Sequence, residues 1–403
     1  MAELGPVTCA GCGLLCDDVV IDPLDDAVTI RPRCELGAQW FSERASRAAN
    51  APAATIRGRP VALETALTRA AELLKTARRP LIHGFDGATV EDARAAVALA
   101  DRLGALVATG SAAGAWPGAP AVPLHGASTA TLGEIRDRSR LIVIWREDPE
   151  TTHPRLLDRL GLDGGSRSER ALLVIDDRDT ATVQRADLRL AWPRERDLEA
   201  LTILHVLQRG LAPRPSELAN ELTGLADRVL AVPHATIVYG AGLTAGAGGQ
   251  RRALALHELV RALCHGRHVV TLELPGAAGT RSADDVLAWQ TGYPQGVDLA
   301  GGHPELVTAI GPLAPSEGVD VSLRVQSATA RLPASVTEIA LSSVPLADDE
   351  DVEVSIRTAA AGVAAAGTAH RLDGVPLALQ APLAGDGPTA AALLTRLLGE
   401  VQR

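Results

Sequence analysis

Four cysteines lie close together near the start of the chain, and their side chains could bind a metal. Cys9, Cys12 and Cys16 are separated by two and by three residues, and Cys34 follows after another 17. Thiolates are ligands of zinc and of iron–sulfur clusters, and a two-residue spacing lets both sulfurs reach one centre. The pattern predicts a metal site made of these four residues. It leaves zinc, a [4Fe–4S] cluster and an empty site as alternatives.

A second candidate is the glycine-rich turn Gly240-Ala-Gly242, which follows an apolar run and precedes a helical stretch. Such a turn is typical of dinucleotide-binding folds, in which an acidic residue about 20 positions further on binds the ribose. The acid here, Glu273, lies 28 residues beyond Ala245. Glycine turns at the ends of parallel strands also occur without a nucleotide, so nucleotide binding is only an alternative hypothesis.

No further pattern predicts catalysis. The ten histidines form no His-x-His or His-Glu-x-x-His pair, and the chain has no Gly-x-Ser-x-Gly elbow. The histidines at predicted strand or helix edges, His125, His153, His265 and His268, are expected to be structural, as is the fifth cysteine, Cys264. We therefore assign no catalytic residue from the sequence.

The elements that would position these residues alternate between strand and helix. Apolar runs typical of strands buried on both faces of a parallel sheet occur at 141–145, 171–175, 236–239 and 268–272. Helical periodicity occurs at 63–74, 90–103 and 249–264. This order predicts an α/β fold with right-handed crossovers. The expected domains are a cysteine module (1–55), a first Rossmann-like domain (56–140 plus about 225–310), a second α/β domain (141–224) and a β-rich C-terminal segment packing on the core (311–403).

The composition excludes several classes of protein. With 46% hydrophobic and 22% charged residues over 403 positions, the chain is typical of globular and not of disordered proteins. Its net charge of −10 argues against nucleic acid or an anionic membrane as a partner. No apolar run is long enough to cross a membrane, and no secretory signal precedes the cysteines. We expect a cytoplasmic protein.

Several segments resemble the B subunit of formylmethanofuran dehydrogenase, within the molybdopterin oxidoreductases. They are CAGCGLLCDD (9–18), TLGEIRDR (131–138), LIVIW (141–145) with the following DP and HPR, VLAWQTGYP (286–294) and GTAHRLDGVP (367–376). The resemblance therefore covers essentially the whole chain. It implies a molybdopterin-oxidoreductase-like fold with a small N-terminal cysteine module followed by Rossmann-like parallel-sheet domains. It also implies that the four N-terminal cysteines are the cluster ligands.

The chain departs from that family where the catalytic metal is held. In the dehydrogenases, a cysteine or selenocysteine before His-Gly ligates molybdenum or tungsten, whereas here Leu124 precedes His125 and Gly126. Leucine has no lone pair for a metal, and Cys264 lies more than 100 residues further on. The segment 274–280 also lacks the donors that hold pterin phosphates in the family. We expect neither molybdopterin nor tungstopterin, and Leu124 and His125 would mark a degenerate active site.

Together these features resemble the B subunit of the formyltransferase/hydrolase complex of aerobic methylotrophs. That resemblance implies a complex that moves a formyl group from tetrahydromethanopterin to methylofuran and hydrolyses it to formate, with the chemistry in other subunits. The chain would be a non-catalytic structural partner of the hydrolase, the formyltransferase and a third subunit. One alternative is an active molybdo- or tungstopterin dehydrogenase in which His125 or Glu134 replaces the thiolate. Another is a stand-alone metal- or nucleotide-binding protein with Gly240 and Gly242 near a phosphate.

Overall fold

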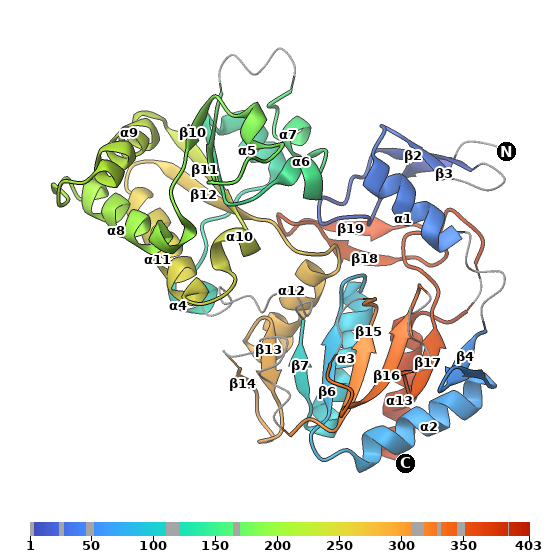
Figure 1. Cartoon of the computed structure of the whole chain (residues 1–403). Helices are drawn as coiled ribbons and strands as arrows, with labels where there is room; N and C mark the ends of the chain where they lie inside the picture. The colour runs from blue at the N-terminus through green and yellow to red at the C-terminus, as the bar shows by residue number, and fades with distance from the viewer. Residues whose placement is uncertain are drawn as a thin grey trace. The chain divides into compact units, whose positions relative to one another are not determined.

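The computed structural model describes residues 4–23, 28–45, 52–109, 121–163, 170–307, 318–328, 332–344, 351–385 and 387–403. The chain divides into two compact units, each taken by itself below (Figure 1). Unit 1 consists of Met1–Ala115, Gly276–Arg371 and Val375–Arg403, and unit 2 of Trp116–Pro275 and Leu372–Gly374. Both contain parallel sheets with helices, so the predicted α/β class is confirmed.

Unit 1 is built on a nine-stranded sheet in the order β14-β13-β7-β6-β15-β16-β17-β4-β5. Its five central strands are parallel, and the strands at both edges are added in antiparallel pairs. The strands are β4 (Ala54–Ile56), β5 (Arg59–Pro60), β6 (Leu81–Gly84), β7 (Leu106–Ala108), β13 (Gly296–Asp298), β14 (Glu305–Leu306), β15 (Val321–Val325), β16 (Thr337–Ser342) and β17 (Val354–Arg357).

Helices of unit 1 bury their apolar faces against this sheet in one core. They are α2 (Leu63–Thr76), α3 (Val90–Leu103), α12 (Thr280–Thr291) and α13 (Ala390–Gln402). In α2 the residues at helical spacing, among them Leu67 and Leu74, are buried as the periodicity predicts. Helix α3 begins at a capping box in which Thr89 and Asp92 each bond the backbone N–H of the other. Reciprocal capping of this kind satisfies amides that the first helical turn leaves unpaired.

The N-terminal part of unit 1 is a small antiparallel sheet in the order β1-β2-β3, followed by helix α1. A separate hairpin of β18 and β19 completes the unit. These elements are β1 (Leu4–Val7), β2 (Val19–Pro23), β3 (Val28–Arg31), α1 (Glu35–Ala45), β18 (Gly367–His370) and β19 (Pro376–Leu379).

Unit 2 is a five-stranded, fully parallel sheet in the order β10-β9-β8-β11-β12. Its central strands are buried along their length, as their continuous apolar runs predict. The strands are β8 (Leu141–Trp145), β9 (Ala171–Ile175), β10 (Leu188–Leu190), β11 (His234–Tyr239) and β12 (His268–Glu273). The helices are α4 (Ala121–His125), α5 (Leu132–Arg138), α6 (Pro149–Thr152), α7 (Leu156–Arg159), α8 (Asp197–Gln208), α9 (Glu217–Ala231), α10 (Ala241–Thr244) and α11 (Gly249–Leu263). No described helix is long and apolar enough to span a bilayer.

The domain boundaries expected from the sequence differ from this division. The sequence predicts that 225–310 joins 56–140, yet β11 and β12 pair with β8 in unit 2. Likewise β15 to β17 of the expected C-terminal segment lie inside the main sheet, beside β6. Local periodicity predicts that a strand exists but does not identify its partner, which is set by three-dimensional packing. Residues 46–51 of the expected cysteine module (1–55) lie outside the described residues.

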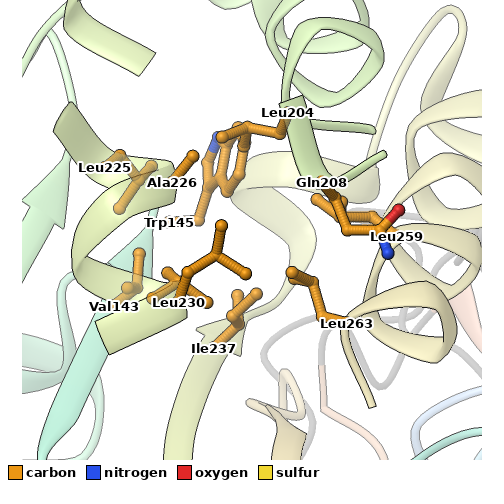
Figure 2. A pocket seen from close by; sticks show the side chains of 11 residues that line it. Val143, Trp145, Leu204, Gln208, Leu225, Ala226, Leu230, Ile237, Leu259 and Leu263 are labelled. Carbon is orange, nitrogen blue, oxygen red and sulfur yellow. The ribbon is translucent and has the colours of Figure 1, made fainter. Parts of the chain in front are cut away.

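A cavity with apolar walls lies within unit 2, between the sheet and three helices. Figure 2 shows side chains of β8, β11, α8, α9 and α11 converging on this space. Gln208 is the one residue with a polar side-chain amide among them, and it donates to Ala262 O at 3.0 Å. Imperfect packing in a core leaves contacts unmade, so this cavity is a place where added carbon atoms should stabilise the fold.

Val143→Ile, which adds one methylene at the cavity wall, is expected to stabilise unit 2. Burial of one CH₂ contributes about 0.8 kcal/mol, and isoleucine suits a strand. The matched control is Val174→Ile on β9, which is buried but does not line the cavity. Overpacking there should cost about 1 kcal/mol or more. Urea unfolding of both variants measures the difference, and equal effects would contradict the cavity assignment.

Candidate functional site

The four cysteines lie on one loop and at the start of one helix in unit 1. Cys9, Cys12 and Cys16 lie between β1 and β2, where the Cys9 N–H donates to Cys16 O at 2.8 Å and closes the loop. Cys34 directly precedes α1, and its carbonyl accepts the Ala38 N–H at 2.9 Å. Cys9 and Cys16 are buried, while Cys12 and Cys34 are half-buried.

The electrostatics of these thiols show that the fold brings them near one another. Burial raises the pKa of Cys9 and of Cys12 to about 12. The charges of Cys12, Cys16 and Cys34 raise the pKa of Cys9 further, and those of Cys16 and Cys34 act on Cys12 in the same way. Without a cation, these two side chains are therefore protonated thiols at neutral pH.

Backbone amides also face the sulfurs. The Gly11 N–H donates to Cys9 Sγ at 3.4 Å, and a backbone hydrogen bond from Leu14 lowers the pKa of Cys12. A Cβ atom at Gly37 would lie 3.2 Å from Cys9 Sγ, so glycine there leaves room beside the sulfur. Amide donors stabilise thiolate charge, and four soft donors suit zinc or an iron–sulfur cluster.

The donor chemistry fits a metal, but the side chains are not arranged as ligands. Within the described ranges, no three His, Cys, Asp or Glu side chains form a group that could hold an ion. The metal predicted for Cys9, Cys12, Cys16 and Cys34 therefore remains a prediction.

The segment expected to be a degenerate active site lies in unit 2. Leu124 and His125 are the last two residues of α4, and the side chain of Leu124 lies outside the described part of the structure. His125 is half-buried, and its Nδ1 has no hydrogen-bond partner among the described residues. Glu134, the other proposed replacement ligand, lies 3.7 Å from Arg138 in a solvent-exposed pair on α5. The structure thus gives Glu134 the surroundings of a surface residue.

The glycine turn lies at the carboxyl end of β11, next to the carboxyl end of β8. The chain leads from β8 to β9 on one side and from β11 to β12 on the other, so the strand order reverses between β8 and β11. Open parallel sheets bind ligands at such a position. Here it holds Glu147, whose Oε1 accepts the Gly242 N–H at 2.6 Å. Glu273 ends the neighbouring strand, in register with Tyr239.

Unit 1 has a corresponding reversal of strand order between β6 and β15. There the Ser327 hydroxyl donates to Asp86 Oδ2 at 2.5 Å, and the Gly279 N–H donates to Asp86 O at 2.8 Å. The Arg324 Nη1 donates to Ser327 O at 2.8 Å. Side chains and backbone of this chain therefore bridge the carboxyl ends of both strands.

Sequence reasoning missed two acids with strongly raised pKa values, the half-buried Glu147 and the buried Asp284. Burial raises the pKa of Glu147 to about 7, against the favourable Gly242 N–H. Burial likewise raises the pKa of Asp284 on α12 to about 7, although the Thr109 hydroxyl donates to its carboxylate. Neither acid belongs to a recognisable motif. For Glu147, its place directly after a predicted buried strand was the one available signal.

Glu147→Gln is expected to reduce the loss of stability as pH rises. The folded protein keeps a proton on Glu147 up to about pH 7, whereas the ordinary pKa is 4.5, so the folded state binds more protons between these values. The stability that Glu147 contributes through its extra proton is fully present below the ordinary pKa of 4.5, and it is lost as pH rises through the folded-state pKa of about 7. Thermal unfolding from about pH 4.5 to pH 8 measures the slope. Exposed Glu199 on α8 gives the control Glu199→Gln, which should retain the wild-type slope. An unchanged slope in the Glu147 variant would contradict the raised pKa.

Comparison with known proteins finds relatives over most of the chain. No protein-family model matches it. It is 28% identical over 402 residues to the B subunit of the tungsten-containing formylmethanofuran dehydrogenase 2 of Methanocaldococcus jannaschii, covering 93% of this chain and 92% of the relative. It is 28% identical over 260 residues to the B subunit of the formyltransferase/hydrolase complex Fhc of Methylorubrum extorquens, covering 63% of this chain and 68% of the relative.

The fold also matches a solved structure. The crystal structure of the formyltransferase/hydrolase complex FhcABCD from Methylorubrum extorquens, in complex with methylofuran, contains a chain that matches with a TM-score of 0.70 and 25% identity. The match covers 87% of this chain and 99% of that one. The chain is thus similar over most of its length to the B subunits of tungsten-containing formylmethanofuran dehydrogenases. It is also a homologue of the Fhc B subunit, with the α/β fold found in the FhcABCD complex.

Proposed function

We propose that the chain is a non-catalytic subunit of a formyltransferase/hydrolase complex. The observation that carries the proposal is Leu124, which stands before His125-Gly126 where the dehydrogenases place their metal-ligating cysteine or selenocysteine. The structural match to a chain of FhcABCD, over nearly all of that chain, supports the assembly.

In this proposal, the complex transfers a formyl group from tetrahydromethanopterin to methylofuran and hydrolyses it to formate. Other subunits carry both reactions, and this chain assembles with the hydrolase, the formyltransferase and a third subunit. The cytoplasmic location expected from the sequence stays a prediction. Zinc or a [4Fe–4S] cluster at the four cysteines would cross-link the N-terminal loop to α1, and a cluster would also supply a one-electron carrier.

One observation favours a second candidate, an active molybdo- or tungstopterin dehydrogenase subunit. The tungsten-containing relatives align over 93% of this chain, compared with 63% for the Fhc B subunit. His125, whose Nδ1 lacks a described partner, would be its metal ligand.

Metal analysis of the native complex distinguishes the two candidates. We would purify the chain anaerobically with its partners and measure tungsten, molybdenum, iron and zinc per chain. The structural role predicts no stoichiometric tungsten or molybdenum and three copurifying subunits. Stoichiometric tungsten or molybdenum, or a stable monomer that oxidises formylmethanofuran, would refute it.

A variant pair tests the same proposal by activity. His125→Ala, in assembled complex, is expected to leave formate release unchanged, because no step occurs at this residue. Glu134→Ala is the second test variant, because the enzyme alternative allows either residue as the metal ligand, and it is likewise expected to leave formate release unchanged. Gel filtration verifies assembly. Loss of activity in an intact His125→Ala complex would favour the enzyme.

A further inference from the structure

The carboxylate of Glu147 lies where an external anion binds in sheets of this topology. A phosphate at the strand reversal would need free amide donors on the glycine turn after β11. The Gly242 N–H is instead bonded to Glu147 Oε1 at 2.6 Å. Glu273 ends the neighbouring strand β12, which is where dinucleotide-binding sheets place the acid that binds the ribose. The Gly242 N–H that would bind the phosphate, however, already donates to a carboxyl group of the same chain.

The turn also packs directly against the residues that follow β8. A Cβ atom at Gly242 would lie 1.8 Å from Arg146 O and 2.9 Å from Glu147 Oε1. A Cβ atom at Gly240 would lie 2.8 Å from the same carboxylate oxygen. The Glu147 side chain therefore fills the space beside both glycines, and a phosphate cannot occupy it at the same time.

Two guanidinium groups act on Glu147. Burial raises the pKa of Glu147 and Asp176 acts in the same direction, whereas the charges of Arg178 and Arg194 act to lower it. Arg194 is also attached to the same turn, because its Nη2 donates to Ala245 O at 2.6 Å. Its Nε is buried and has no hydrogen-bond partner in the described structure. An amide donor and two guanidinium groups would remain if the carboxylate were removed.

We infer that the Glu147 carboxyl group closes the strand-reversal site of unit 2 to nucleotides, and that truncating it opens a phosphate-binding site. The equivalent position in unit 1, bridged by Asp86 and Ser327, is closed in a comparable way. The inference concerns unit 2 alone, so its failure would not affect the proposed assembly.

The test compares wild type, Glu147→Ala and Glu199→Ala in the full chain. Glu199→Ala removes a carboxyl group of the same size from an exposed position of the same unit. Inorganic phosphate and ADP are titrated at constant ionic strength by calorimetry. Wild type and the control should bind neither probe saturably over the concentrations tested. The dissociation constant of Glu147→Ala for phosphate should lie at least about tenfold below the lower limit set for wild type. Saturable nucleotide binding by wild type, or no gain in Glu147→Ala, would overturn the inference.

Hydrogen exchange provides a readout that does not depend on a ligand. The peptide containing Gly242 should exchange faster in Glu147→Ala, because its amide loses its acceptor. Glu147→Gln keeps an oxygen acceptor and should retain wild-type protection, which also covers the case that the alanine variant folds poorly. Fast exchange of this amide in wild type would show that the bond is not formed.

Discussion

Cys34→Ser is expected to abolish metal binding at the N-terminal module and to release α1 from the loop that carries the other three cysteines. Cys34 is the one member of the set that precedes the helix, so its loss removes the link between loop and helix. Structural zinc sites contribute about 10 kcal/mol or more to folding in small modules, so the effect should be large. Metal content per chain and proteolysis of the N-terminal region measure it.

Cys264→Ser is the matched control for that experiment. Cys264 lies in unit 2, where its Sγ donates to Val269 O at 3.2 Å, far from the cysteine module in sequence. The Cys264→Ser variant should keep the metal content and protease resistance of wild type. Metal retained in Cys34→Ser would show that Cys34 is not a required ligand. Wild type purified anaerobically without any metal would mean that the four cysteines are structural thiols. Metal loading should also release protons, because Cys9 and Cys12 are thiols at neutral pH in the metal-free protein.

Asp197→Ala is expected to destabilise unit 2 by about 3–5 kcal/mol. The fully buried Asp197 carboxylate accepts from Trp145 Nε1 at 3.1 Å and Trp192 Nε1 at 2.9 Å. It also accepts from Arg146 Nε at 3.0 Å, and that guanidinium is only 3% exposed. Removing the carboxylate leaves one buried cation and two buried indole N–H groups without this acceptor.

Urea unfolding followed by tryptophan fluorescence measures this loss, since Trp145 and Trp192 contact the altered site. Glu199→Ala removes an equal charge from the same helix, where the pair with Arg196 is exposed and screened by solvent, so its loss should change stability little. Asp197→Asn keeps one acceptor oxygen, so its stability should lie between those of Asp197→Ala and Glu199→Ala. Equal stability of the two alanine variants would contradict the assigned network.

The fold was predictable where one strand or helix carries its own signal. The runs at 141–145 and 171–175 form buried strands with the expected bounds, because continuous apolar residues suit a sheet covered on both faces. The two-residue β5 and β14 have no such pattern, since edge strands this short are formed by the pairing of their neighbours. The predicted end of the second α/β domain at 224 differs from the structure for a related reason: β11, which follows that position, pairs with β8, which lies far before it in the sequence.

The candidate site was predictable only where residue type and spacing coincide. Cys9, Cys12, Cys16 and Cys34 were recognisable as candidates because few structural roles need four clustered thiols. The charges of the other three do act on Cys9, but metal binding by the four stays a prediction. Glu147 was not recognisable, because one glutamate among 49 acidic residues acquires its role only through the approach of Gly242 from a distant segment. The spacing of the glycines predicts a turn, but it contains no information about what occupies it.

The order of strands in the main sheet of unit 1 has a consequence for synthesis on the ribosome. Strand β6 pairs with β15, and roughly 240 residues separate Gly84 from Val321. Because chains are synthesised at about 5–20 residues per second, roughly 10 to 50 s pass between the synthesis of β6 and that of its partner β15. Nearly all of unit 2 is made during that interval and can fold first, as one almost continuous segment. The nascent chain thus exposes the apolar edge of β6 throughout, which makes it a substrate for chaperones until its C-terminal half emerges.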